Sequence, residues 1–189
     1  MPPPAPFLSS NEPIKSPKEI YQLLISKNPI ENKVGYEAFL RRTHWLTGKS
    51  PENLKKYACQ QLNVKERDVI VSLKYVEPAF LWASQDGLES AKLVMVEAAY
   101  KYIQSIGDQF PPIVVWNFFD SQKMRMIIHD GHHRAYFYHR IRKRVQVVLL
   151  EPIGNYNIVE DKFRYAFQIQ KRVIDLPVSR TRDFSVIIS

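Results

Sequence analysis

The chain has little cysteine, no long apolar run and fewer acidic than basic side chains. The 189 residues include a single cysteine, Cys59, which excludes an internal disulfide framework and fits a reducing compartment. No apolar run approaches the roughly 20 residues of a membrane span. The start, Met1 to Pro6, is proline-rich and lacks the basic segment and apolar core of a secretory signal. We therefore expect a cytoplasmic protein without a membrane span.

The shortage of acidic residues gives the chain a formal net charge of +8, from 27 Lys and Arg against 19 Asp and Glu. A basic excess favours polyanionic partners, such as nucleic acid, nucleotide phosphates or an acidic surface. Hydrophobic residues make up 45% and aromatic residues 12%, which is enough for a real core and excludes wholesale disorder. The length fits one domain with extensions, or two small domains.

The first third of the chain is predicted to be an arm followed by helices. Residues 1 to about 16 are proline-rich and polar, which is typical of an extended arm. Ser16-Pro17 and Ser50-Pro51 each place a capping residue before a proline that suits the first turn of a helix. A further helix is expected over residues 34–46, before Gly48. We assign residues 1–66 to this arm and helical extension.

From about residue 68 the pattern changes to strands alternating with helices. Four short apolar, largely β-branched runs predict strands: Val69–Leu73, Ile113–Trp116, Met124–Ile128 and Val145–Leu150. A long amphipathic helix is expected to open at residues 84–87, and a shorter one over residues 133–142. We predict an α+β core over residues 67–152, followed by a C-terminal helix and tail over 153–189, with the helix from Asn157 to about Val173.

The stretch Ile127 to Arg134 carries the candidate chemistry. An apolar strand stops at Asp130-Gly131 and a helix follows, so unpaired amides at the positive end of the helix dipole would stabilise an anion. Gly131 can take a positive φ and let a phosphate approach the backbone. Arg134, in the first turn, would grip two phosphate oxygens with its guanidinium. The pattern indicates a phosphate cradle; the alternative is an ordinary Asp-Gly turn that binds nothing.

Histidines gather at this turn. Four of the five in the chain belong to it: His129, His132, His133 and His139. Turns on a rigid scaffold often carry binding chemistry, so the cluster favours a functional site. A zinc site is disfavoured, because adjacent residues on a strand and turn rarely converge on one ion and no second cysteine or spaced histidine pair accompanies them.

The order of elements from Asp68 to Glu151 resembles the ParB/sulfiredoxin-like superfamily. The run Pro112-Ile113-Val114-Val115 and the loop Asp130-Gly131-His132-His133-Arg134 carry the resemblance, which covers slightly under half of the chain. It implies a mixed-sheet core whose loop holds nucleotide phosphates. Sulfiredoxins have a cysteine where this chain has His132. Partition proteins carry a helix-turn-helix module, for which the residues after Glu151 are too few.

Two other branches fit better. The free-serine kinases share the D-G-x-H-R loop, and Glu77, shortly after the first strand, would be their general base. The plasmid fertility-inhibition factors, the oncogenic suppression activity proteins, share the architecture of a helical extension on such a core. That branch is associated with ATP hydrolysis and DNA cleavage.

The resemblance to the fertility-inhibition factors implies an ATPase and Mg²⁺-dependent DNase that interferes with conjugative or T-DNA transfer. Its cofactors would be ATP and Mg²⁺; its partners would be DNA, the nucleotide and a conjugation or type IV secretion component. The assigned residues are Gly131, His132, His133 and Arg134 for phosphate binding, Asp130 for the loop or a metal-bound water, and Glu77 for the attacking water. Glu77, Asp130, His133 and Arg134 are the candidate catalytic residues among them. Two alternatives stay open: a free amino-acid kinase using the same residues, and a non-catalytic inhibitor that binds a conjugation component.

Overall fold

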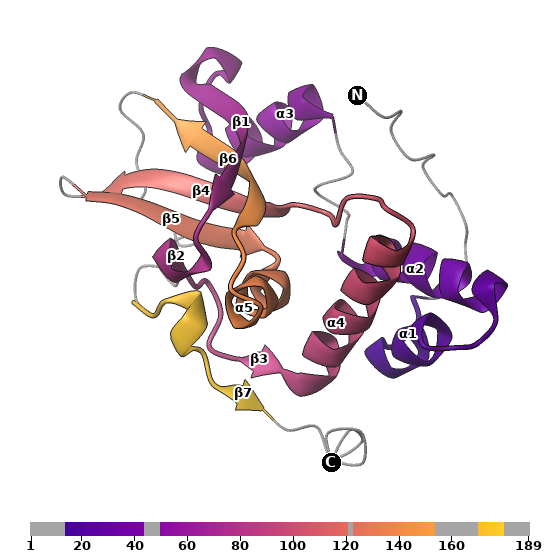
Figure 1. Cartoon of the computed structure of the whole chain (residues 1–189). Helices are drawn as coiled ribbons and strands as arrows, with labels where there is room; N and C mark the ends of the chain where they lie inside the picture. The colour runs from indigo at the N-terminus through magenta and orange to yellow at the C-terminus, as the bar shows by residue number, and fades with distance from the viewer. Residues whose placement is uncertain (1–13, 44–49, 121–122, 154–169, 180–189) are drawn as a thin grey trace.

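The structure is a computed structural model that describes residues 14–43, 50–120, 123–153 and 170–179. In this part of the chain, helices pack on both faces of a mixed five-stranded sheet, so the predicted α+β class is confirmed (Figure 1). The predicted C-terminal helix lies outside the described residues except at its end, where Val173 opens a short 3₁₀ turn, Val173–Asp175. No helix in the described ranges has the length and apolar character needed to cross a bilayer.

The central sheet has the strand order β1-β6-β4-β5-β2. Its strands are β1 (Val69–Val76), β2 (Leu81–Trp82), β4 (Ile113–Asp120), β5 (Lys123–Asp130) and β6 (Val145–Pro152). The pairs β1–β6 and β4–β5 are antiparallel, whereas β4–β6 and β2–β5 are parallel. Most of β6 is buried on both faces, as its continuous apolar run predicted. Two short strands, β3 (Leu88–Glu89) and β7 (Val178–Ser179), form a separate parallel pair.

Two predicted boundaries were wrong. The strands predicted over residues 113–116 and 124–128 are longer, because β4 continues to Asp120 and β5 runs from Lys123 to Asp130. Phe118 is held in the strand by stacking on Trp116, with ring centroids 5.4 Å apart. The long helix, α4 (Ser90–Ser105), starts after residues 84–87, which form a loop. Ser84 of that loop bonds the carbonyl of Ile128 in β5 and the ring of His132.

The first helices form largely where capping residues indicated. In α1 (Pro17–Leu24) Ser16 and Glu19 form a reciprocal capping box, and in α3 (Pro51–Leu62) Ser50 accepts the amide of Asn53. Between them α2 (Pro29–Thr43) begins earlier than predicted, and the predicted end at residue 46 lies outside the described residues. Its start is fixed by Asn28, whose side-chain oxygen accepts the amide of Ile30 at 3.0 Å. These local bonds set the directions in which the three helices leave the turns.

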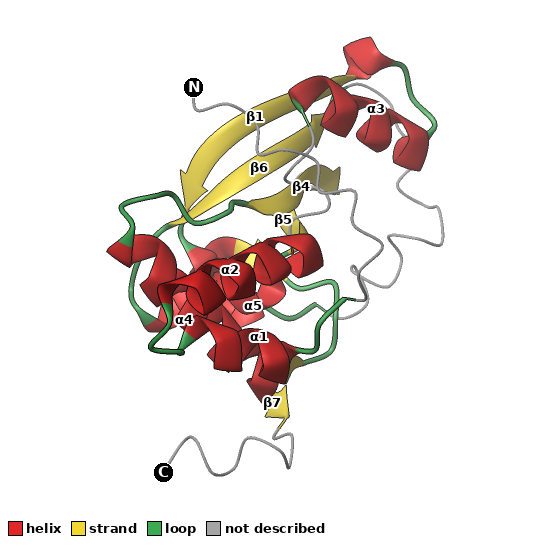
Figure 2. Ribbon diagram, turned by 90° about the vertical axis from the view of Figure 1, so that its right-hand side faces the viewer, coloured by secondary structure: helices red, strands yellow, loops and turns green. Residues whose placement is uncertain are grey.

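The helical extension packs on the core. Ile20 of α1 and Phe39 of α2 are fully buried in one cluster with Met95 of α4 and with Phe137 of α5 (His132–Arg140). Figure 2 shows α1, α2, α4 and α5 grouped together, with α3 apart from them. On the other face of the sheet, α3 packs against a cluster that includes Trp116. The end of α2 is thereby brought next to the start of α5, a proximity that no local pattern in the sequence encodes.

Candidate functional site

The strand, turn and helix predicted around Gly131 are present. β5 ends at Asp130, Gly131 has a φ of 104°, and α5 begins at His132. Gly131 is the N-cap residue and has no side chain with which to bond the first amides. In the described part of the chain, no acceptor bonds the amides of His132, His133 or Arg134, while that of Ala135 bonds the Gly131 carbonyl at 2.9 Å. Three N–H groups therefore present the positive end of the helix dipole.

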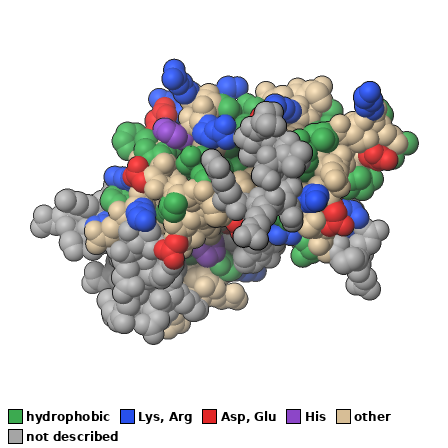
Figure 3. Space-filling view, turned by 90° about the horizontal axis from the view of Figure 1, so that it is seen from below, with side chains coloured by type: hydrophobic (Ala, Val, Ile, Leu, Met, Phe, Trp, Pro, Cys, Tyr) green, Lys and Arg blue, Asp and Glu red, His purple; other side chains and the backbone are tan. Residues whose placement is uncertain are grey.

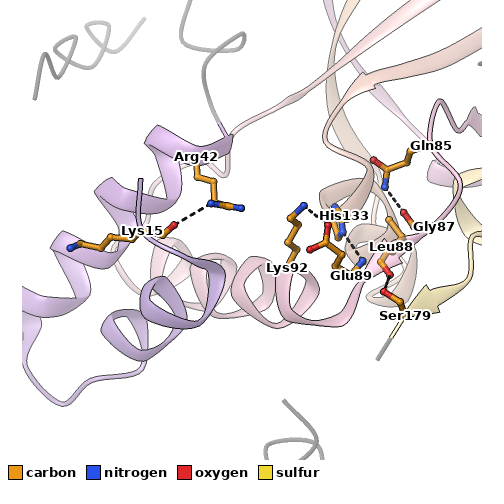
Figure 4. Close-up of polar contacts among 9 residues, drawn as sticks. All are labelled: Lys15, Arg42, Gln85, Gly87, Leu88, Glu89, Lys92, His133 and Ser179. Carbon is orange, nitrogen blue, oxygen red and sulfur yellow. Dashed lines mark hydrogen bonds and ion pairs between the residues drawn. The ribbon is translucent and has the colours of Figure 1, made fainter. Parts of the chain in front are cut away.

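The residues that carry these amides line a cavity of about 560 Å³, which lies in the range of small-molecule sites. Its lining comes from separate segments: Ile14, Arg42 and Thr43; Ser84 and Gln85; Lys92, Met95 and Val96; and residues 129–134. Figure 4 shows Arg42 and Lys92 reaching toward the same space from α2 and α4. The guanidinium of Arg42 donates to the Lys15 carbonyl at 3.2 Å, and the Lys92 ammonium pairs with Glu89. Sequence analysis missed both cations, because only the packing of α2 and α4 brings them to the cavity.

Arg134 does not present its guanidinium to a ligand, which corrects the role that the sequence indicated. The residue is 2% exposed. Its Nη1 donates to the carbonyls of Pro112 at 2.7 Å and Pro111 at 3.3 Å. Its Nη2 donates to the Thr43 carbonyl at 3.0 Å and to the Asp130 carboxylate at 2.8 Å. Burial lowers the pKa of Arg134 while Asp130 opposes that shift. The guanidinium therefore ties the end of α2 and the start of β4 to the turn.

The rings of His132 and His133 also bond the protein. His132 is 5% exposed and its Nε2 accepts the amide N–H of Ser84 at 2.9 Å. The Nε2 of His133 accepts the amide N–H of Glu89 at 3.0 Å (Figure 4). Burial lowers the pKa of His132 to about 3 and that of His133 to about 4, so both rings are neutral near pH 7, each with its proton on Nδ1. Their side chains fasten the loop before α4, which leaves their backbone amides as the donors available to an anion.

The other two histidines of the cluster have different surroundings. The Nε2 of His129 lies 2.7 Å from the hydroxyl of Tyr57 on α3, and its ring packs edge-on against Trp116. Burial lowers the pKa of His129. His139 is exposed near the carboxyl end of α5. His129, His132 and His133 thus all line the cavity but bond different parts of the protein, whereas His139 does not line it.

Glu77 and Asp130, the two candidate carboxylates, are at opposite ends of α5. Glu77 is exposed and accepts a hydrogen bond from the Nε of Arg144 at 2.9 Å, beyond the carboxyl end of the helix. A nine-residue helix is about 13 Å long, so Glu77 does not line the cavity. Asp130 does line it, and only its Oδ2 is used by Arg134. Its other oxygen fits an ion such as Mg²⁺, which binds one or two carboxylates together with phosphate oxygens.

Gly131→Ala is expected to lower the free energy of unfolding by about 3 kcal/mol, because the new side chain would have to adopt a positive φ and would clash with Ile113. A Cβ there would lie 2.4 Å from Cγ2 and 2.7 Å from Cβ of Ile113. Gly107→Ala is the matched control, since Gly107 has a φ of 70° but a Cβ would meet nothing within 4 Å. Urea unfolding of both variants separates the two costs. Equal losses would show that the contact with Ile113 does not constrain the turn.

The fold and the cavity define an α+β protein in which the amino end of a helix opens on a pocket flanked by two cations. No protein-family model matches the chain, no curated protein matches it, and no solved structure does. The resemblance to the ParB/sulfiredoxin-like superfamily therefore stays a prediction.

Proposed function

We propose that the protein binds the phosphate tail of ATP in the cavity at the start of α5 and hydrolyses it with Mg²⁺. One observation carries the proposal: the amides of His132, His133 and Arg134 have no protein acceptor in the described part of the chain, and these residues line a cavity together with Arg42 and Lys92. Backbone donors at a helix start bind phosphate oxygens, and two cations offset the charge of a triphosphate.

The phosphate ligands of this proposal differ from those that the sequence indicated. The backbone of residues 132–134 replaces the histidine and arginine side chains. Lys92 supplies a compact positive charge, and Arg42 supplies a planar donor pair that suits two oxygens. Asp130 is the carboxylate that would hold Mg²⁺, which would neutralise charge on the phosphates when bound. The buried Arg134 keeps Asp130 in place through their 2.8 Å ion pair.

The geometry favours hydrolysis over phosphoryl transfer to a free amino acid. The kinase alternative needs Glu77 as its base, and Glu77 is paired with Arg144 at the far end of α5. Among the described lining residues, Asp130 is the one carboxylate. A water molecule needs less room than an amino-acid substrate, and an ion-paired carboxylate can orient it by accepting its hydrogen bond.

We propose DNA as the second substrate, cut in a Mg²⁺-dependent reaction, as a plasmid fertility-inhibition factor would do. The net charge of +8 supports a polyanionic partner. The charge does not locate the DNA, because Lys and Arg side chains are scattered over the face in Figure 3. If the ATPase and nuclease assays both fail, the remaining proposal is a non-catalytic protein that binds a conjugation component.

Lys92→Ala is expected to weaken ATP binding by about tenfold, because it removes a charged partner of the phosphates from a partly enclosed site. Lys101→Ala is the matched control: it lies on the same helix, is exposed, and pairs with Glu97 at 2.8 Å as Lys92 pairs with Glu89. Calorimetric titration with Mg·ATP measures both variants. Equal affinities in the two variants would contradict the proposed role of the cavity.

Assays of the products separate the activities. Release of inorganic phosphate from ATP with no acceptor present supports the hydrolase. Phosphate found only on added serine supports the kinase. If ATP neither raises the melting temperature nor releases phosphate, only the non-catalytic inhibitor remains. Nicking of a supercoiled plasmid with Mg²⁺, and its loss on chelation, tests DNA cleavage independently of ATP.

A further inference from the structure

Cationic and aromatic side chains cluster at the β2 edge of the sheet. Trp82 of β2 pairs with Ile127 of β5 on one side and forms an isolated bridge with Arg172 on the other. The guanidinium carbon of Arg172 lies 3.8 Å from the centroid of the Trp82 ring, and that of Arg125 lies 5.1 Å from it. Two guanidinium groups from distant parts of the chain thus converge on one indole. Stacking on the ring holds each of them in a defined place.

The two guanidinium groups repel each other. Burial lowers the pKa of Arg172, and the charge of Arg125 lowers it further, while Asp175 acts in the opposite direction. Arg172 donates one hydrogen bond, from Nη1 to the Phe80 carbonyl at 2.6 Å. No carboxylate in the described ranges forms an ion pair with it. An arginine has five N–H donors, so Arg172 retains donors that an anion between the two groups would use.

An exposed aromatic residue is joined to this pair through its backbone. Phe80 is 57% exposed and ends the 3₁₀ turn Pro78–Phe80 directly before β2, where its carbonyl is held by Arg172. Lys171, beside Arg172, is exposed as well. Guanidinium groups that bind phosphates, next to a free aromatic face that stacks a base, are the chemistry of single-strand recognition.

We propose that this edge patch, defined as Phe80, Trp82, Arg125, Lys171 and Arg172, binds single-stranded nucleic acid. Phosphodiester groups bind at Arg172 and Lys171, and an unpaired base stacks on Phe80. A duplex could bind the same cations but would not contact Phe80 by stacking, because its base faces are already stacked on one another. An acidic peptide has no bases, so it would not stack on Phe80 either. The patch is independent of the proposed ATP site, since none of its five residues lines the cavity.

The test measures binding of a fluorescein-labelled oligothymidylate of about 20 nucleotides by anisotropy. Arg172→Gln is expected to weaken binding about tenfold and to reduce the slope of log affinity against log salt by about 1. Arg140→Gln is the matched control, because it removes the same charge from an exposed site at the end of α5. That control is expected to weaken binding less than about twofold.

Two further variants keep the test decisive if Arg172→Gln disturbs the packing of Trp82. Lys171→Gln changes an exposed side chain and is expected to weaken binding about threefold without lowering the melting temperature. Phe80→Leu keeps every charge and removes the ring, and is expected to weaken binding at least about fivefold. Equal losses for Arg172→Gln and Arg140→Gln, no loss for Phe80→Leu, tighter binding of a duplex, or equal competition by polyglutamate would each overturn the proposal.

The outcomes also distinguish this patch from the cavity. Arg172→Gln is expected to keep the wild-type affinity for Mg·ATP, and Lys92→Ala to keep that for the oligonucleotide. If Lys92→Ala leaves ATP binding unchanged while Arg172→Gln still weakens strand binding, only the proposed ATPase fails. The reverse pattern overturns the edge patch alone.

Discussion

Replacing Arg134 by methionine should lower the free energy of unfolding by about 3–5 kcal/mol. The change leaves the carbonyls of Thr43, Pro111 and Pro112 without their donor and removes the cation beside Asp130. Each lost partner costs free energy because the site is dry, with Arg134 only 2% exposed. Urea unfolding followed by circular dichroism measures the loss.

Arg144→Ala is the matched control, since it also breaks an arginine–carboxylate pair, with Nε 2.9 Å from Glu77, but on the exposed surface. It is expected to cost less than about 1 kcal/mol. Arg134→Lys keeps the charge but loses the planar set of guanidinium donors, so it should still cost about 2 kcal/mol. If Arg134→Met costs no more than Arg144→Ala, Arg134 does not join α2 to the turn.

Acidification from about pH 6.5 to about pH 4.5 should remove about 5 kcal/mol of stability through His132 and His133 together. The folded-state pKa values, about 3 and about 4, lie below the ordinary value of 6.5. The unfolded chain therefore takes up protons first as the pH falls. The stabilisation is complete above about pH 6.5 and is lost as the pH falls toward the folded values, when protonated rings no longer accept from Ser84 and Glu89.

Carboxylates also titrate at the acid end of this range, so variants isolate the histidine contribution. His132→Gln removes one titrating group while keeping an acceptor near the Ser84 amide, and should reduce the pH slope by about one proton. His139→Gln removes an exposed imidazole and should leave the slope unchanged. Unfolding free energies across the pH range decide the matter: equal slopes in the two variants would show that His132 is not buried neutral.

Much of the fold could be predicted because local chemistry specifies it. Ser16 and Ser50 fixed two helix starts, and the apolar run over Val145–Leu150 correctly predicted the strand β6. Errors arose where tertiary contacts override local signals. Residues 84–87 form a loop and not a helix start, because the Ser84 hydroxyl bonds the Ile128 carbonyl at 2.6 Å while its amide bonds His132.

The candidate site divides in the same way. Gly131 was located from the sequence, because a strand, a turn and a helix in succession leave a residue that needs a positive φ. The uses of the neighbouring side chains were not predictable. Whether Arg134 faces a ligand or three carbonyls depends on where α2 and the start of β4 lie, and neither is adjacent to it in the chain.

By itself, the sequence determined the α+β class, several of the helices and strands, and a helix start with unbonded amides at Gly131, because these depend on hydrogen bonds and side-chain patterns within a few residues. Only the tertiary structure decided which charges meet there. In the folded protein Arg134 is buried, and Arg42 and Lys92 line the cavity. Glu77 lies at the far end of α5, and Arg125 and Arg172 stack on Trp82. Long side chains can point several ways, and the segments packed around them select one.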